Sequence, residues 1–174
     1  LLKNKIFSFI NVLGLTIGIT VCLMIFLFIL NQFSVDKFHI QGDRIHRVMR
    51  GFNSSKEPVP YLSPPYASAL LTDYPEDIKK AVRVMPSNGL FSFNNIAFNE
   101  KKLYIADADF FELFSLRLIK GNAKTVLQNP ASVVLTETSA KKYFGDENPI
   151  GKVLTLDKNK PLTVTGIAKD VPTN

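Results

Sequence analysis

The two histidines of this sequence and a nearby aspartate have side chains of types that bind zinc. His39, Asp43 and His46 stand at i, i+4 and i+7, so on a helix they would share one face. Gly42 interrupts such a helix, however, and His46 falls in a stretch that we predict to be a strand. No fourth ligand is evident. We therefore interpret these residues as solvated polar groups, keep a zinc site as the alternative, and predict no resident metal.

A second group, residues 145–152, resembles a phosphate-binding loop. Five residues separate Gly145 from Gly151, whereas the motif has four, and Val153 stands where Ser or Thr would hold magnesium. Pro149 also removes one of the backbone donors that would cradle a phosphate. The pattern is therefore interpreted as a helix end and a turn, and no cofactor is predicted.

The third group is a set of carboxylates that could serve acid–base chemistry, namely Asp107, Asp109 and Glu112. Asp107 and Asp109 fall at a predicted helix N-terminus, where the macrodipole favours acidic side chains without any catalytic role. The sequence has no nucleophile elbow and no H-E-x-x-H motif, and its one cysteine, Cys22, lies in an apolar run. We predict that the protein is not an enzyme and has no catalytic residues.

The elements that must position these groups begin with an uncharged, mostly apolar stretch, residues 6–35. As a helix it would be roughly 45 Å long, which exceeds the hydrocarbon core of a bilayer, about 30 Å. A secretory signal core has only about 7–15 residues and ends at a small-x-small site, so an uncleaved membrane helix is predicted. Gly14 and Gly18 form a G-x-x-x-G pair that permits close approach of a second helix. Basic residues flank both ends of the stretch, so their distribution alone leaves the orientation open.

The charged residues exclude one class of partner. The chain has 21 basic and 15 acidic residues, and the lysines and arginines are scattered among the acids. A nucleic-acid-binding domain would concentrate them on one face together with stacking aromatic side chains. We therefore predict no nucleic acid among the partners.

The rest of the chain reads as one α+β domain of short strands and short helices. Ser63 is predicted to cap a helix with Tyr66, Ala69 and Leu70 on one face, and Thr136 to cap another that ends at Gly145. A third short helix is predicted over 107–114. Strands are predicted over 44–52, 78–84, 90–98, 103–106, 116–119, 131–135, 153–156 and 162–171, the last two as a hairpin.

Four stretches also resemble a known family, and their joint order makes the resemblance specific. The first is L-K-N-K and N-V-L-G-L-T-I-G within residues 2–18, and the second is D-K-F-H and D-R-I-H-R-V within 36–48. The third is A-D-A-D-F-F-E-L-F at 106–114 with K-G at 120–121. The fourth comprises V-V-L-T-E, A-K-K-Y-F-G, N-P-I-G-K and G-I-A-K-D-V-P within 133–172. In this order they are similar to the N-terminal part of a MacB/FtsX-type ABC-transporter permease, especially the long version found in Bacteroidetes, although the family often has tyrosine at His46.

The resemblance implies a cytoplasmic start and transmembrane helix over residues 1–36 and a periplasmic core domain over 37–174, truncated at its C-terminal end. It further implies a permease of the bacterial inner membrane that exports or extracts a substrate. In such permeases a separate cytoplasmic ATPase drives movement of the periplasmic domain, a mode called mechanotransmission. The implied partners are that ATPase subunit, the membrane, a second permease copy or pseudo-dimer mate, and a periplasmic adaptor.

Under this hypothesis Gly14 and Gly18 pack the helix against another one, and the juxtamembrane stretch transmits movement to the domain. The alternative from another class is a single-pass, membrane-anchored periplasmic module for binding or sensing. The candidate coupling residues of the juxtamembrane stretch are Asp36, Phe38, His39, Arg44 and Arg47.

Overall fold

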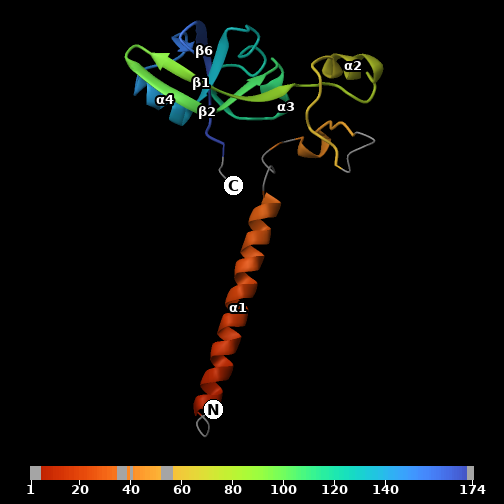
Figure 1. The fold of residues 1–174 in the computed structure, drawn as a ribbon, viewed down its shortest axis with the longest axis vertical. Coiled ribbons are helices and arrows are strands. Elements are labelled where there is room, and N and C mark those ends of the chain that lie inside the picture. Colours follow the sequence, from red (N-terminus) through yellow and green to blue (C-terminus); the bar gives the residue numbers. More distant parts are fainter. Residues whose placement is uncertain (1–4, 35–38, 40, 52–56, 172–174) are drawn as a thin grey trace. The chain divides into compact units, whose positions relative to one another are not determined.

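The computed structural model describes residues 5–34, 39, 41–51 and 57–171. These residues fall into two compact units, one built on helix α1 and the other spanning His39–Val171. Figure 1 shows the first as one long helix and the second as a sheet with short helices. The α+β class predicted from the sequence is confirmed.

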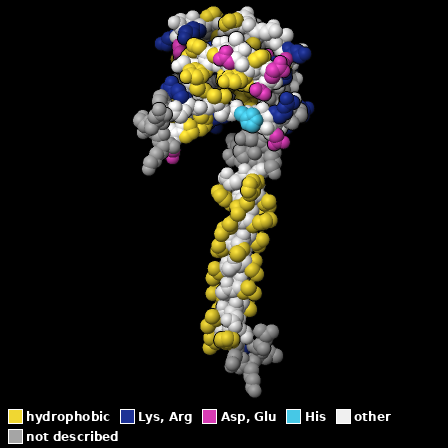
Figure 2. Space-filling model, turned by 90° about the vertical axis from the view of Figure 1, so that its right-hand side faces the viewer, with side chains coloured by type: hydrophobic (Ala, Val, Ile, Leu, Met, Phe, Trp, Pro, Cys, Tyr) yellow, Lys and Arg dark blue, Asp and Glu magenta, His cyan; other side chains and the backbone are white. Residues whose placement is uncertain are grey.

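Helix α1, Lys5–Ser34, is the apolar stretch of the sequence. Within the described residues it is the one helix long and apolar enough to cross a membrane, and the mean hydropathy of its 18-residue apolar window is 2.7. Figure 2 shows hydrophobic side chains along its whole length. The hydroxyls of Thr16 and Thr20 donate to the carbonyls of Val12 and Thr16, four residues earlier, at 2.7 and 2.8 Å. These polar groups are thus satisfied inside the helix, as a hydrocarbon environment requires.

The second unit contains one six-stranded sheet with β6 at its centre. Strand β6 pairs antiparallel with β5 and β3 and parallel with β4, while β5 pairs with β1 and β1 with β2. The strands are β1 Val84–Phe93, β2 Ile96–Ala106, β3 Leu118–Lys120, β4 Ser132–Thr136, β5 Val153–Leu156 and β6 Lys160–Ala168. The helical elements are η1 Gly42–Arg44, α2 Pro65–Asp73, α3 Phe110–Leu113 and α4 Glu137–Phe144.

Helix α4 covers one face of the sheet and closes the larger core. Its predicted bounds are confirmed, because Thr136 accepts a hydrogen bond from the Ser139 backbone N–H and Gly145 ends the helix with φ of 60°. Leu154 and Val164, from β5 and β6, are fully buried. This core contains Phe91, Val133, Leu135, Ala140, Tyr143, Phe144, Leu154, Val164 and Ile167.

Several local predictions are wrong. The strand predicted over 44–52 is not formed by the described residues, which contain η1 and a single bridge from Arg50 to Val59. The cap predicted at Ser63 is absent, since Pro64 occupies the cap position without a side-chain hydrogen bond. The predicted face of α2 is not buried. These predictions required packing partners that the described part of the segment lacks: none of residues 41–51 and 57–83 is buried.

The predicted strand over 90–98 is in fact a turn and parts of two longer strands. Asn94 adopts φ of 50° and reverses the chain between β1 and β2, a conformation that asparagine tolerates better than most residues. The predicted strand at 103–106 is the end of β2, and that predicted over 78–84 is reduced to the start of β1 at Val84.

Candidate functional site: the α3 junction

A short helix, α3, lies where three distant parts of the domain meet. Phe111 on α3 is 7% exposed and packs with Val126 and with Ala168 at the end of β6. The ring of Phe110 contacts those of Phe111 and Phe114, with centroids 5.3 and 5.0 Å apart. The aromatic face predicted for this helix therefore anchors it to the sheet.

His39 contacts the end of α3. Its ring centroid lies 5.7 Å from that of Phe114, tilted by 58°. Its Nδ1 lies within hydrogen-bonding reach of the Phe114 carbonyl oxygen. Because a carbonyl can only accept, Nδ1 carries the proton in this contact. His39 is half-buried, and of the juxtamembrane candidates it is the one with a described contact to the end of α3.

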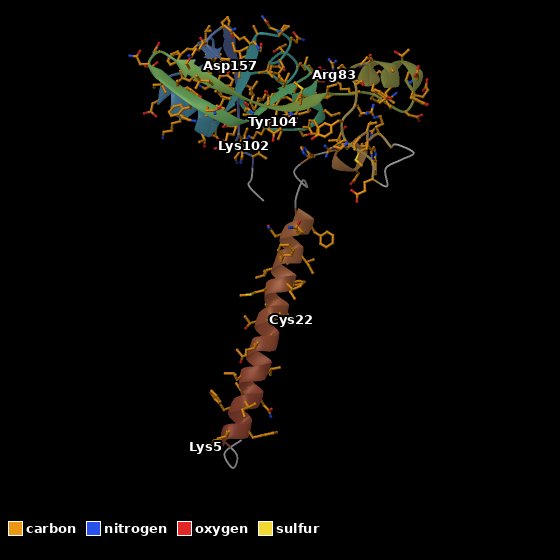
Figure 3. All side chains as sticks on the ribbon, in the orientation of Figure 1. Lys5, Cys22, Arg83, Lys102, Tyr104 and Asp157 are labelled. Carbon is orange, nitrogen blue, oxygen red and sulfur yellow. The ribbon has the colours of Figure 1, made fainter. Side chains whose placement is uncertain are left out.

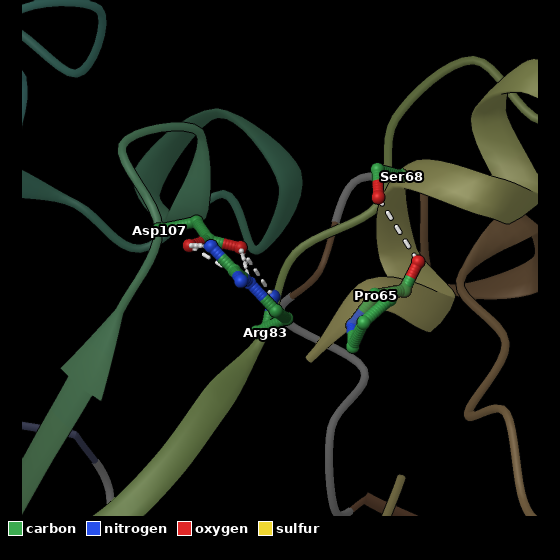
Figure 4. Close-up of polar contacts among 4 residues, drawn as sticks. All are labelled: Pro65, Ser68, Arg83 and Asp107. Atoms are coloured by element: carbon green, nitrogen blue, oxygen red, sulfur yellow. Dashed lines mark hydrogen bonds and ion pairs between the residues drawn. The ribbon is translucent and has the colours of Figure 1, made fainter. Parts of the chain in front are cut away.

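Arg83 holds the chain just before α3. Its Nε and Nη2 donate to Asp107 Oδ2 and Oδ1 at 2.9 and 2.7 Å, a two-point pair drawn in Figure 4. The Arg83 backbone N–H also donates to Oδ2 at 2.9 Å, and Asp107 N–H donates to the Arg83 carbonyl at 3.2 Å. The hydrogen bond from Arg83 lowers the pKa of the Asp107 carboxyl, despite partial burial that opposes this shift. Such two-point pairs between a guanidinium and a carboxylate fix the relative orientation of the two groups and also stabilise their contact.

Lys80 forms ion pairs with two acidic residues at the same helix. Its ammonium pairs with Asp109 at 3.2 Å and with Glu112. The hydrogen bond to Glu112 is the main reason that the pKa of Lys80 is raised. We name these contacts together the α3 junction, which comprises His39, Lys80, Arg83, Asp107, Asp109, Glu112 and Phe114.

The carboxylates of the junction thus have structural partners. Asp107 and Asp109 precede α3 as the sequence predicted, and Asp109 stands at its N-cap position without a capping hydrogen bond. Each acid also faces a base supplied from the chain before β1. This arrangement can hold and orient α3, and the described residues contain no group of three or more His, Cys, Asp or Glu that could bind a metal.

The two helix-packing candidates lie on one face of α1. Gly14 and Gly18 line a shallow, open groove, and apart from the neighbouring residues and the backbone of α1 itself no atom lies within 4 Å of a Cβ added to either. Asn11 and Cys22 line the same groove, one turn before and one turn after the glycines. Figure 3 labels Cys22 on the helix. The groove therefore has small residues and one amide along its floor and large apolar side chains at its sides (Ile10, Leu15, Ile19, Leu23 and Phe26), a composition that suits contact between membrane helices.

The remaining candidates divide into two sets. Asp36 and Phe38 lie outside the described residues. Arg44 in η1 and Arg47 after it are exposed, and neither makes an ion pair with the described residues. The junction thus includes one predicted coupling residue, His39.

The loop that resembled a phosphate-binding motif is also occupied by internal contacts. Lys152 pairs with Glu147, and its ammonium lies 5.6 and 5.3 Å from the ring centroids of Phe93 and Phe144. Gly151 adopts φ of 82°, as a turn glycine does. The lysine therefore closes a turn over the aromatic core.

A family model described as MacB-like periplasmic core domain matches residues 8–174. The chain belongs to this family. The match includes most of α1 as well as the sheet domain, so the MacB-like unit on this chain comprises both.

The relatives agree with this assignment. The macrolide export ATP-binding/permease protein MacB of Aggregatibacter actinomycetemcomitans is 33% identical over 87 residues, which are 48% of this chain and 13% of that protein. The periplasmic region of MacB from Actinobacillus actinomycetemcomitans has a TM-score of 0.52 at 30% identity, covering 60% of this chain and 49% of that one. The chain thus spans only part of these relatives.

Two more distant structures share the fold. A domain of a permease protein from Porphyromonas gingivalis gives a TM-score of 0.50 at 22% identity, over 63% of this chain and 51% of that one. The extracellular domain of the ABC-type transporter YknZ from Gram-positive bacteria gives 0.53 at 16% identity, over 63% and 58%. At these identities the likeness concerns the MacB-like fold alone.

Sequence reasoning missed most of the junction in this MacB-like domain. Lys80 and Arg83 were not singled out, although both are basic residues just before a strand. Their acidic partners lie 24 to 32 residues further along the chain. The one available signal was that Asp107 and Asp109 precede an aromatic helix, and spacing alone did not identify the bases that pair with them.

Proposed function

We propose that this chain is the first membrane helix and the periplasmic core domain of a MacB/FtsX-type ABC-transporter permease in the bacterial inner membrane. The observation that carries the proposal is the family match over residues 8–174, which treats helix and domain as one unit. The N-terminus lies in the cytoplasm and the domain in the periplasm. A separate cytoplasmic ATPase drives the permease to export or extract a substrate.

The α3 junction supplies the mechanical step. Residues 35–38 connect α1 to His39, and His39 contacts the end of α3. From α3, Phe111 reaches Ala168 on β6, the central strand of the sheet. Because packed elements move together, a displacement of the chain at His39 reaches the sheet through α3. The ion pairs of Lys80 and Arg83 keep α3 oriented during that movement.

The groove on α1 supplies the partner contact in the membrane. Gly14 and Gly18 let another helix of the permease, or of its dimer mate, approach closely. Asn11 lies on the same face and offers an amide for hydrogen bonding across helices. The helix pair then moves as one body when the ATPase acts.

The test uses the full-length permease with its ATPase in proteoliposomes. Replacement of both Gly14 and Gly18 by Leu is expected to weaken permease assembly and lower ATP hydrolysis. Ile17→Leu with Val21→Leu is the matched control, because neither residue lines the groove. If the glycine variant keeps both assembly and ATP hydrolysis, the packing role is wrong.

A second experiment addresses the junction. His39→Ala is expected to preserve assembly but to uncouple movement of the periplasmic domain from ATP hydrolysis, measured with spin labels at Lys158 in the two copies. Lys141→Ala is the control, because Lys141 is an exposed residue of α4 that makes no ion pair with the described residues. Unchanged, nucleotide-dependent label distances in His39→Ala would refute the coupling role.

The name of the macrolide-export relative joins an ATP-binding part and a permease in one protein. The resemblance described above implies a separate ATPase subunit instead. Copurification of this permease with an ATPase encoded by another gene supports the proposal. A chain that stands alone in the membrane, without ATPase or further spans, supports the single-pass binding or sensor module.

A further inference from the structure

Strand β2 forms one edge of the sheet and is long for an edge strand. It has 11 residues and pairs with β1 on one side, and no other described strand pairs with it. An open edge of this length presents unpaired backbone N–H and C=O groups, which natural proteins either block or use for strand addition.

Two lysines mark the middle of this edge. Glu100 pairs with Gly89 and Leu103 with Ser87, so Lys101 and Lys102 on β2 oppose the single residue Asn88 on β1. Both lysines are exposed, and neither forms an ion pair within the described part of the chain. Figure 3 labels Lys102 and Tyr104 on this strand.

Glu100, which directly precedes the two lysines on β2, does not neutralise their charge. Glu100 accepts hydrogen bonds from Lys142 and Tyr143 at 2.7 and 2.6 Å through the same oxygen. The positive charge of Lys101 and Lys102 is therefore left for an external partner. Like charges facing each other across a strand pair are unfavourable, so antiparallel pairing of two β2 edges centred on these lysines is disfavoured.

The C-terminal part of the edge is apolar. Tyr104 and Ile105 are 60% and 54% exposed, and Met85, opposite Ile105 on β1, is 56% exposed. Ile105 and Met85 lie on one face of the sheet and Tyr104 on the other, so exposed apolar side chains flank the open edge on both faces, as on a binding surface. Along β2 the surface therefore changes from basic to apolar within four residues.

We propose that the outer edge of β2 binds an extended segment of a partner protein by strand addition. The segment has acidic side chains opposite Lys101 and Lys102 and apolar side chains opposite Tyr104 and Ile105. Backbone hydrogen bonds to the edge supply attraction, and the lysines select the partner by charge.

The test uses the full chain in phosphatidylcholine nanodiscs and three synthetic peptides. The first has 11 residues, the length of β2, with alternating Thr and Val and two central Glu residues. The second replaces both Glu by Lys, and the third carries N-methyl groups on alternate backbone amides of the first. The acidic peptide is expected to bind and to slow amide hydrogen exchange at the outer edge of β2. The other two are expected to bind at least about tenfold more weakly.

Charge reversal makes the test specific. Lys101→Glu with Lys102→Glu is expected to lose the acidic peptide and to gain the lysine peptide, a gain that a misfolded variant could not show. Lys158→Glu in the β5–β6 turn, together with Lys160→Glu at the start of β6, is the matched control and keeps the original preference. Equal binding of all three peptides, or no binding of any, overturns the proposal. So does protection of β2 without peptide in parallel nanodiscs that contain phosphatidylglycerol, or pairing of two copies through this edge.

Discussion

Removal of one hydroxyl, in Tyr143→Phe, tests how α4 is attached to the edge of the sheet. Tyr143 is 3% exposed, and its hydroxyl donates to Glu100 Oε1 on β2 at 2.6 Å. The Lys142 ammonium reaches the same oxygen at 2.7 Å and lies 4.0 Å from the Phe98 ring centroid. Burial, together with Glu100, raises the pKa of Tyr143 far above its ordinary value, so the phenol stays protonated and remains a donor.

The expected loss of stability depends on how far the acceptor, Glu100, is exposed to water. A hydrogen bond to a charged group contributes about 1.5–3 kcal/mol. Glu100 keeps Lys142, and its side chain is 27% exposed, so water can replace the lost hydroxyl in part. We therefore expect Tyr143→Phe to lower the free energy of unfolding by about 1.5 kcal/mol. With a urea m-value of about 2 kcal/mol/M, the midpoint falls by roughly 0.7 M.

Urea unfolding of the full chain in detergent, followed by circular dichroism, measures this loss. Glu100→Ala leaves the buried phenol without an acceptor and is expected to cost about 2–3 kcal/mol. The double variant should lose less than the sum of the two, by about 1 kcal/mol, because both single changes remove the same hydrogen bond. Strictly additive losses would refute the reasoning.

The coupling also has a predicted pH dependence. Burial alone would raise the pKa of Glu100, but hydrogen bonds from Lys142 and Tyr143 and the charge of Lys142 outweigh it and leave the pKa below its ordinary 4.5. A lowered folded-state pKa stabilises the fold above pH 4.5, and this contribution is lost as the pH falls through the folded-state value. The coupling free energy between Tyr143 and Glu100 should therefore be largest at neutral pH and become smaller at acidic pH. A coupling free energy that is equal at neutral and acidic pH would contradict the assignment of this hydrogen bond.

Three further predictions concern packing and capping, each measured by the same urea unfolding. Gly166→Ala places a Cβ 2.4 Å from Val126 Cγ2, which is buried and stiff, and should cost about 1–3 kcal/mol; an unchanged midpoint would show that Val126 can yield. Thr136→Ala removes the cap of α4 and should cost about 1 kcal/mol, whereas Thr136→Ser should restore most of it. Leu154→Ala should cost about 2–5 kcal/mol because the residue is 0% exposed, while its exposed neighbour Val153 should tolerate Ala with a much smaller loss; similar losses at both would contradict the assigned core.

The parts of the fold that were predicted correctly depend on short-range signals. Helix α4 is bounded by a Thr cap and a Gly end that lie within its own residues, and the β5–β6 hairpin is flanked by alternating strands. Helix α1 follows from length and apolar content alone. In each case the physical cause acts between residues close in sequence.

The parts that failed depend on distant partners. The strand predicted over 44–52 had a plausible composition, but no described strand pairs with it beyond the bridge at Arg50. The turn at Asn94 has no glycine or proline to mark it, so one predicted strand replaced the two real ones. The parallel pairing of β4 with β6 joins residues about thirty positions apart, and no local pattern encodes that register.

The candidate site shows the same division. The acids before α3 were recognised, but the prediction assigned them to a helix dipole because Lys80 and Arg83 are remote in sequence. His39 was selected from its position beside the membrane helix. Its contact with Phe114 joins residues 75 positions apart and could only come from the three-dimensional arrangement.

The segment between His39 and β1 is attached in a way that makes it sensitive to salt. Its described residues 41–51 and 57–83 include no buried side chain, and its ion pairs to the α3 region join the exposed bases Lys80 and Arg83 to acids whose side chains are 24% to 53% exposed. Dissolved ions screen such pairs over about 8 Å at physiological ionic strength, whereas they leave an apolar core intact. Raising the salt concentration should thus loosen this segment from α3 while the sheet stays folded, so that the ionic medium around the domain sets how firmly the two are joined.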